Sequence, residues 1–78
     1  MSDQKKIIEA IAEILGLPVA DIDVESHFQD DLGLNPIEIA DLLGNLTDKF
    51  NIVFDPSEPG QVKTVADLTE LIEDKLLE

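Results

Sequence analysis

The feature that most constrains this chain is the recurrence of apolar residues at helical spacing in three separate segments. The segments are residues 3–15, residues 36 to about 51, and residues 65–77. Each segment places apolar side chains on one helix face: Ile7, Ile8, Ile11, Ile14 and Leu15; Ile39, Leu42, Leu43, Leu46 and Phe50; Val65, Leu68, Leu71, Ile72 and Leu76. No long run shows the alternation of a strand. The pattern therefore predicts an all-α fold, a small antiparallel bundle of helices.

Local signals mark the ends of these helices. Gly16 closes the first helix, because glycine readily adopts the left-handed conformation found after many helices. Asn35 is a preferred N-cap, Pro36 suits the first helical position, and Glu38 stands three residues after the cap, as in a capping box. Thr64 caps the last helix. These residues predict helix starts at Pro36 and at residue 65.

Two connections join the helices. The first is too apolar for a solvated linker, so we expect it to cross the bundle and contribute core residues, with a short helical turn near residues 19–22. Its apolar residues are Leu17, Val19, Ile22, Val24, Phe28 and Leu32. The second connection, residues 51–63, contains two prolines and a glycine, and Ser57 is able to cap a short turn there. The prediction is a four-helix bundle of three main helices and a short third helix.

Size and charge limit the function. Seventy-eight residues form a single domain, residues 1–78, and with no cysteine only apolar packing can stabilise it. The 18 acidic and 5 basic residues give a net charge of −13, which disfavours nucleic acid and anionic membranes and favours basic surfaces of partner proteins. Solubility alone is the simpler explanation of such a charge. The repulsion between copies also favours a monomer.

Targeting signals are not apparent. No run approaches the ~18 apolar residues that span a bilayer. Acidic residues interrupt the N-terminal stretch MSDQKKIIEAIAEILG, and no small-residue cleavage site follows it, so it is typical of a helix and not of a signal peptide. We expect a soluble, cytoplasmic protein.

The stretch FQDDLGLNPIEIADLL, residues 28–43, resembles the acyl carrier protein family. Phe28, Asp31, Leu32 and Gly33 stand at positions that match the family pattern. Close substitutes follow at Ile37, Glu38 and Leu42, and the later FNIVFDP and KTVADL also resemble the family. The resemblance covers nearly the whole chain. It implies a carrier that is not an enzyme, with 4′-phosphopantetheine on a serine at the start of the second helix and acyl groups on the thiol of that arm.

The chain departs from the family at that serine. Pro36 occupies its position and has no nucleophile, and Asn35 replaces the preceding aspartate of the family. The other serines, Ser2, Ser26 and Ser57, lack both the preceding Asp-Leu-Gly and the following amphipathic helix. We therefore expect no 4′-phosphopantetheine cofactor.

The resulting hypothesis is a non-catalytic docking, regulatory or decoy module for enzymes of fatty-acid or polyketide-type biosynthesis. One alternative is a working carrier that is modified at another serine. The other alternative is an acidic interaction domain that is unrelated to acyl chemistry.

The resemblance makes the second helix the docking surface for basic patches of acyl-chain-processing enzymes. Its candidate docking residues are Leu34, Ile37, Glu38, Asp41 and Asp48. An ordinary solvated helix face explains the carboxylates equally well.

Metal and catalytic sites have weak support. Asp30, Asp31 and Glu38 would suit a weak Ca²⁺ or Mg²⁺ site if the loop brings them together, because hard cations prefer oxygen ligands. The only histidine is His27, which has no cysteine or second histidine beside it, so catalytic triads and zinc sites are unsupported.

Overall fold

The computed structural model describes residues 3–77, and within them the chain is helical. Its elements are α1 (Asp3–Leu15), η1 (Val19–Asp21), α2 (Pro36–Phe50), η2 (Pro59–Gln61) and α3 (Val65–Leu76), where η marks a single 3-10 turn. Within the described residues, β-type pairing is limited to one isolated bridge between His27 and Thr64. The predicted all-α fold is confirmed. The two 3-10 turns lie in the regions where the sequence predicted short turns. Ser57, however, does not cap the second one, because the residue before η2 is Glu58 and no side chain caps it.

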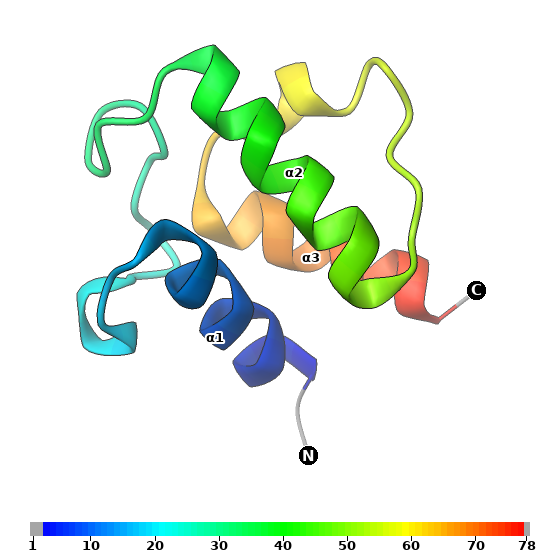
Figure 1. Cartoon of the computed structure of the whole chain (residues 1–78), viewed down its shortest axis with the longest axis horizontal. Helices are drawn as coiled ribbons and strands as arrows, with labels where there is room; N and C mark the ends of the chain where they lie inside the picture. Colours follow the sequence, from blue (N-terminus) through cyan, green and yellow to red (C-terminus); the bar gives the residue numbers. More distant parts are fainter. Residues whose placement is uncertain (1–2, 78) are drawn as a thin grey trace.

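The three long helices form a small bundle. Helix α1 packs against both α2 and α3, while η1 lies against α1 and η2 against α2. In Figure 1, α2 and α3 run from left to right and α1 runs in the opposite sense, so α1 is the antiparallel partner of both. None of the helices within residues 3–77 is both long and apolar enough to cross a membrane.

The predicted cap of α2 is present atom by atom. Asn35 has an extended backbone, and its Oδ1 accepts a hydrogen bond of 2.8 Å from the Glu38 amide. Glu38 Oε1 accepts in return from the Asn35 amide at 3.0 Å, which completes the capping box. Pro36 is the first helical residue. Thr64 and Asp67 form a second capping box at the start of α3, of which only the threonine was predicted.

Both predicted helix ends are also found. Gly16 follows α1 with a φ of +73°, the left-handed conformation that glycine adopts without strain. Helix α2 ends at Asn51, which is left-handed as well and donates its amide to Thr47 O. Asparagine tolerates this conformation better than most residues, so the chain turns here without a glycine.

The core lies between the three helices and is closed by the first connection. Its fully buried members are Ile7, Ile11, Phe28, Leu42, Leu46, Val65, Leu68 and Ile72. The first connection contributes residues to the core, as expected, although not every apolar residue in it is buried. Ile22 and Phe28 are buried, but Leu17 and Val19 are 36% and 49% exposed. A single 3-10 turn offers few positions to the core, and Ile22 at its end is the one that is buried.

Backbone hydrogen bonds fasten the first connection to the start of α3. Val65 donates to Ser26 O at 3.0 Å and Ala66 donates to Val24 O at 2.8 Å. These are amides of the first helical turn, which have no partner within the helix. The Phe28 amide donates to Lys63 O at 2.9 Å. The connection thereby satisfies the helix start and holds Phe28 in the core, immediately before the segment that leads to α2.

Candidate functional site

The position that the sequence singled out lies at the exposed first turn of α2. Asn35, Pro36 and Ile37 are all exposed, and the Ile37 side chain has 72% of its surface free. Proline at the first helical position removes an amide hydrogen that would have no partner within the helix. The same residue offers no hydroxyl, thiol or amine. The geometry is therefore a well-formed helix start without a nucleophile at residue 36.

The loop before α2 owes its shape to Asp31. Its Oδ2 accepts the His27 amide at 2.7 Å and lies 3.4 Å from His27 Nδ1. The His27 carbonyl accepts in turn from the amides of Asp31 and Leu32, and Gly33 follows with a φ of +70°. The Leu34 amide then donates to Phe28 O. The Asp-Leu-Gly motif thus folds the loop back on itself, and the chain then continues into the start of α2.

These contacts also affect the titration of the loop carboxylate. The His27 amide, with a smaller contribution from the His27 side chain, holds the pKa of the Asp31 carboxyl below its usual value. At the start of α3, the amides of Thr64 and Lys63 lower the pKa of Asp67, and His27 adds a weaker Coulomb effect. Of the two carboxylates, only Asp31 contacts His27 directly, through the His27 amide and Nδ1.

The proposed cation site is not supported. Residues 3–77 contain no group of three or more histidine, cysteine or acidic residues placed to hold a metal ion. Asp30, Asp31 and Glu38 would have suited a weak cation site if the loop had brought them together. In the structure, Asp31 Oδ2 accepts the His27 amide and Glu38 Oε1 accepts the Asn35 amide. One oxygen of Asp31 and one of Glu38 therefore accept hydrogen bonds from backbone amides.

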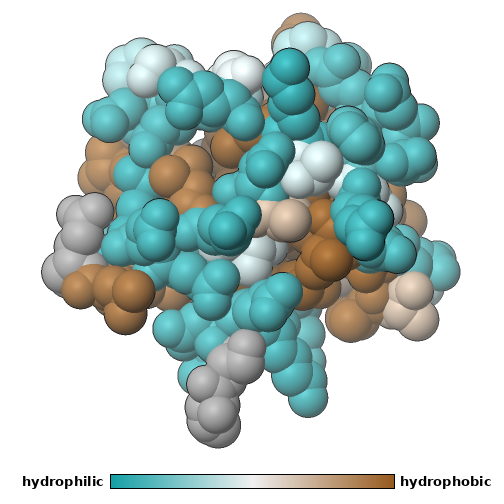
Figure 2. Space-filling model, turned by 180° about the vertical axis from the view of Figure 1, so that it is seen from behind, coloured by the Kyte–Doolittle hydropathy of each residue, from teal (hydrophilic) through white to brown (hydrophobic). Residues whose placement is uncertain are grey.

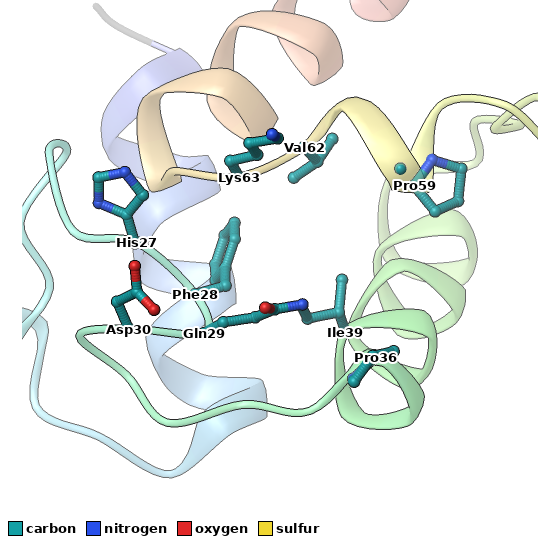
Figure 3. A pocket seen from close by; sticks show the side chains of 10 residues that line it. His27, Phe28, Gln29, Asp30, Pro36, Ile39, Pro59, Val62 and Lys63 are labelled. Atoms are coloured by element: carbon teal, nitrogen blue, oxygen red, sulfur yellow. The ribbon is translucent and has the colours of Figure 1, made fainter.

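A cavity of about 570 Å³ lies beside the first turn of α2. Pro36 and Ile39 of α2 line one side, and Pro59 of η2 and Val62 line the side across from them, as Figure 3 shows. Phe28 projects into the space between them. The polar residues that line the cavity include Gln29 and Lys63. Sequence reasoning missed this cavity, because one of its walls, residues 59–63, comes from a segment far along the chain from the other two.

The outer face of α2, defined here as Ile37, Glu38, Asp41 and Asp48, is exposed along its length. Glu38 is partly engaged, since it closes the capping box. Leu34 differs from the rest, because it is half-buried and packs against the core. Seen from the far side in Figure 2, hydrophilic side chains also dominate, with apolar surface in separate patches. A hydrophilic surface alone therefore does not single out α2.

The other hydroxyl candidates lie in different surroundings. Ser26 is half-buried in the first connection, and its carbonyl accepts the Val65 amide. Ser57 is exposed in the second connection, before the single turn η2. Ser2 lies outside the described residues. Neither Ser26 nor Ser57 begins an α-helix.

Comparison with known proteins gives concordant results. A family model described as "Phosphopantetheine attachment site" matches residues 5–72. An acyl carrier protein of Exiguobacterium sp. AT1b is 40% identical over 68 residues, which are 87% of this chain and 86% of the relative. The acyl carrier protein of Exiguobacterium sibiricum is 40% identical over 65 residues, which are 83% of this chain and 82% of that protein.

Solved structures show the same likeness in three dimensions. The crystal structure of an acyl carrier protein from Thermotoga maritima is similar with a TM-score of 0.77 and 27% identity, over 94% of this chain and 85% of that one. The solution structure of the apo doublet acyl carrier protein from prodigiosin biosynthesis has a TM-score of 0.75 at 22% identity, over 92% of this chain and 35% of the other. The second likeness concerns the fold alone.

Proposed function

The chain belongs to the acyl carrier protein family, and from that premise we propose that it acts without the prosthetic group, as a docking or regulatory module for acyl-chain-processing enzymes. The observation that carries this proposal is Pro36 at the exposed first turn of α2. The enzymes are those of fatty-acid or polyketide-type synthesis. Under the proposal the protein works beside them as a cytoplasmic monomer and catalyses no reaction itself.

The residues at the start of α2 do not fit covalent attachment of 4′-phosphopantetheine. Attachment needs an oxygen nucleophile on residue 36, and the proline ring carries only methylene groups and a tertiary amide nitrogen. The neighbouring Asn35 is occupied, because its Oδ1 accepts the Glu38 amide. An amide side chain is in any case a poor nucleophile.

The retention of the scaffold supports a role in binding. Around residue 36 the capping box is complete, the Asp31 loop is folded, and the core of the bundle is closed by Phe28. The outer face of α2 presents an exposed Ile37 together with Asp41 and Asp48. With a net charge of −13, long-range attraction to a basic enzyme surface speeds encounter, and a central apolar contact adds affinity.

Intact-mass analysis tests the proposal. The protein is incubated with coenzyme A and a phosphopantetheinyl transferase of broad specificity, with the Exiguobacterium sibiricum relative as positive control. We expect the relative to gain one phosphopantetheine and this protein to gain none. A gain by this protein would overturn the proposal, and peptide mapping would then show whether Ser2, Ser26 or Ser57 carries the arm.

Affinity capture tests the other half of the proposal. The protein is immobilised and exposed to lysate of the source cells, and a variant with Asp41 and Asp48 both changed to lysine is the matched control. We expect enzymes of acyl-chain synthesis to bind the unmodified protein and not the variant. Specific capture of proteins unrelated to acyl chemistry would favour the general acidic interaction domain instead.

A further inference from the structure

A groove in the surface lies between the first two turns of α1 and the single turn η1. Its volume is about 320 Å³, and it is lined by Gln4, Lys5, Ile8, Val19 and Ile22. Residues 4, 5 and 8 share one face of α1, because positions three and four apart are neighbours on a helix. Val19 begins η1 and Ile22 ends it, and side chains three residues apart eclipse each other in a 3-10 turn. The two elements pack together, α1 in blue and η1 in cyan in Figure 1, and we call the space between these faces the α1–η1 groove.

The surface of this groove is mainly apolar and only partly covered. Ile22 is buried and Ile8 is half-buried, but Val19 leaves 49% of its surface exposed. Asp21, the carboxylate of η1, does not line the groove, because a 3-10 turn directs it to another face than Val19 and Ile22. The groove therefore offers apolar surface with no carboxylate among the residues that line it.

The charge at the rim of the groove is opposite to the charge of the whole protein. Lys5 lines the groove and Lys6 follows it, and both are exposed, in a chain with a net charge of −13. Among residues 3–77, the ion pairs involve His27, Lys49 and Lys75, so neither Lys5 nor Lys6 is paired with a described carboxylate. Both lysines also lie in the first turn of α1, where the helix dipole does not stabilise a cation. The rim is therefore suited to an anionic partner.

The size of the groove limits what can fill it. Ligand pockets usually measure about 300–1,000 Å³, and this groove lies at the lower end of that range. We propose that the α1–η1 groove is a second docking surface, which binds a segment of a partner protein that carries one large apolar side chain flanked by carboxylates. The apolar side chain fills the space beside Val19 and Ile22, and the carboxylates pair with Lys5 and Lys6.

This surface extends the proposed function. The outer face of α2 is acidic and the rim of the α1–η1 groove is basic, so the two surfaces select partners of opposite charge. They also lie on different elements. A protein with both surfaces can hold two partners at the same time, which is a use for a carrier fold that has no group to carry.

Titration with short capped peptides, followed through the NMR chemical shifts of the protein, tests the groove. The probe peptide has one leucine between two aspartates on either side. We expect it to shift the amides of residues 4–8 and 19–22. A matched peptide with serine for the leucine, and another with lysines for the aspartates, should each bind at least about fivefold more weakly, because one loses the apolar side chain and the other the opposite charge. Hexanoate should also bind more weakly than the probe, and equal affinity would overturn a protein segment as the occupant.

Substitutions in the protein separate the two contributions. The double change Lys5→Gln and Lys6→Gln should weaken the probe peptide about fivefold at low salt, since each exposed pair contributes little alone. The double change Lys49→Gln and Lys63→Gln alters the net charge equally and should leave the affinity within about twofold. Val19→Thr keeps the shape of the side chain and should weaken binding about threefold, because it replaces a methyl group by a hydroxyl.

The control for the apolar contact is Val53→Thr, at a 76% exposed position outside the groove, which should leave the affinity unchanged. No binding at millimolar peptide concentration, or shifts confined to other elements, would overturn the proposal. Equal weakening by the two double lysine changes would also overturn it, because net charge alone would then explain the binding. These measurements use no enzyme bound to α2, so their failure would leave the proposed function as it stands.

Discussion

Replacing Asn35 with Asp and Pro36 with Ser should restore a nucleophile and leave the fold nearly unchanged. An aspartate keeps the oxygen that accepts the Glu38 amide at 2.8 Å, and its charge near the helix start is worth about 0.3–1 kcal/mol. Repulsion from the Glu38 carboxylate, which lies beside the Asn35 amide, opposes that gain. Serine at residue 36 breaks no native hydrogen bond, because proline donates none.

The cost of the double substitution comes mainly from the unfolded chain. Pro36 has a backbone conformation that suits proline. Replacing it gives the unfolded chain more conformational entropy, which destabilises the folded state by about 0.4–1 kcal/mol. With the cap charge acting in the other direction, the net change in the free energy of unfolding should stay within ~1 kcal/mol. Most of the surroundings are solvent, since Asn35, Pro36 and Glu38 are all exposed. Repacking of neighbouring side chains therefore adds no further cost.

Urea denaturation followed by circular dichroism measures the stability, and intact mass after incubation with coenzyme A and a transferase measures attachment. We expect a cooperative transition close to that of the unmodified protein, and the gain of one phosphopantetheine at position 36 of the double variant. A molten variant, or a loss of more than about 3 kcal/mol, would refute the assignment of the helix start. A well-folded variant that stays unmodified would show that the transferase needs more than the serine and the aspartate.

Three further predictions concern the core, the pH and the outer face of α2. Leu46→Ala should destabilise by about 2–5 kcal/mol in urea because Leu46 is fully buried, whereas Leu77→Ala at an 81% exposed position should change stability by less than about 0.5 kcal/mol. The pKa of Glu58 is lowered in the folded protein, by the Asp55 amide first and by Lys75 second. The ionised Glu58 carboxylate therefore stabilises the fold above the ordinary carboxyl pKa, and this stabilisation is lost as the pH falls through the lowered pKa. The stability difference between the protein and Glu58→Gln should therefore shrink as the pH falls below the ordinary carboxyl pKa of 4.5, in denaturation measured at each pH. Changing Asp41 and Asp48 to lysine should slow association with a captured basic enzyme by about tenfold at low salt and much less at high salt, as measured by surface plasmon resonance. An equal effect at both salt concentrations would contradict long-range electrostatic attraction as the cause.

The parts of the fold that could be predicted are those decided by neighbours in the sequence. Asn35, Pro36 and Glu38 make their contacts within one helical turn, so the start of α2 was predicted correctly to the atom pairs. The end of α1 at Gly16 was also predictable, because it depends only on the backbone conformation of that glycine. The bounds of α1 and α2 followed from the same local rules, and α3 ends at Leu76, one residue before the predicted end.

The rest depended on contacts between distant segments. Leu17 and Val19 have the same apolar character as Ile22, and only the path of the connection across α1 decides which of them is buried. Asp31 Oδ2 accepts the His27 amide, a contact that depends on the path of the loop backbone. The cavity and the contact of Glu58 with Lys75 join segments that no periodic pattern relates. Local patterns therefore locate the attachment position but not its surroundings.

The atoms that hold the start of α2 in place do not belong to the residue 36 side chain. The cap uses Asn35 Oδ1 and Glu38 Oε1, and the approach to it uses the Leu34 amide and the carboxylate of Asp31. Residue 36 can thus change from a nucleophile to proline without loss of the helix or its outer face. Under the proposed function, the loop, the cap and the acidic helix are the features that enzymes recognise, and none of them needs a hydroxyl at residue 36. This separation is why the mass measurement and the capture experiment can fail independently. The first depends on residue 36, and the second depends on the docking that we propose for Ile37, Asp41 and Asp48.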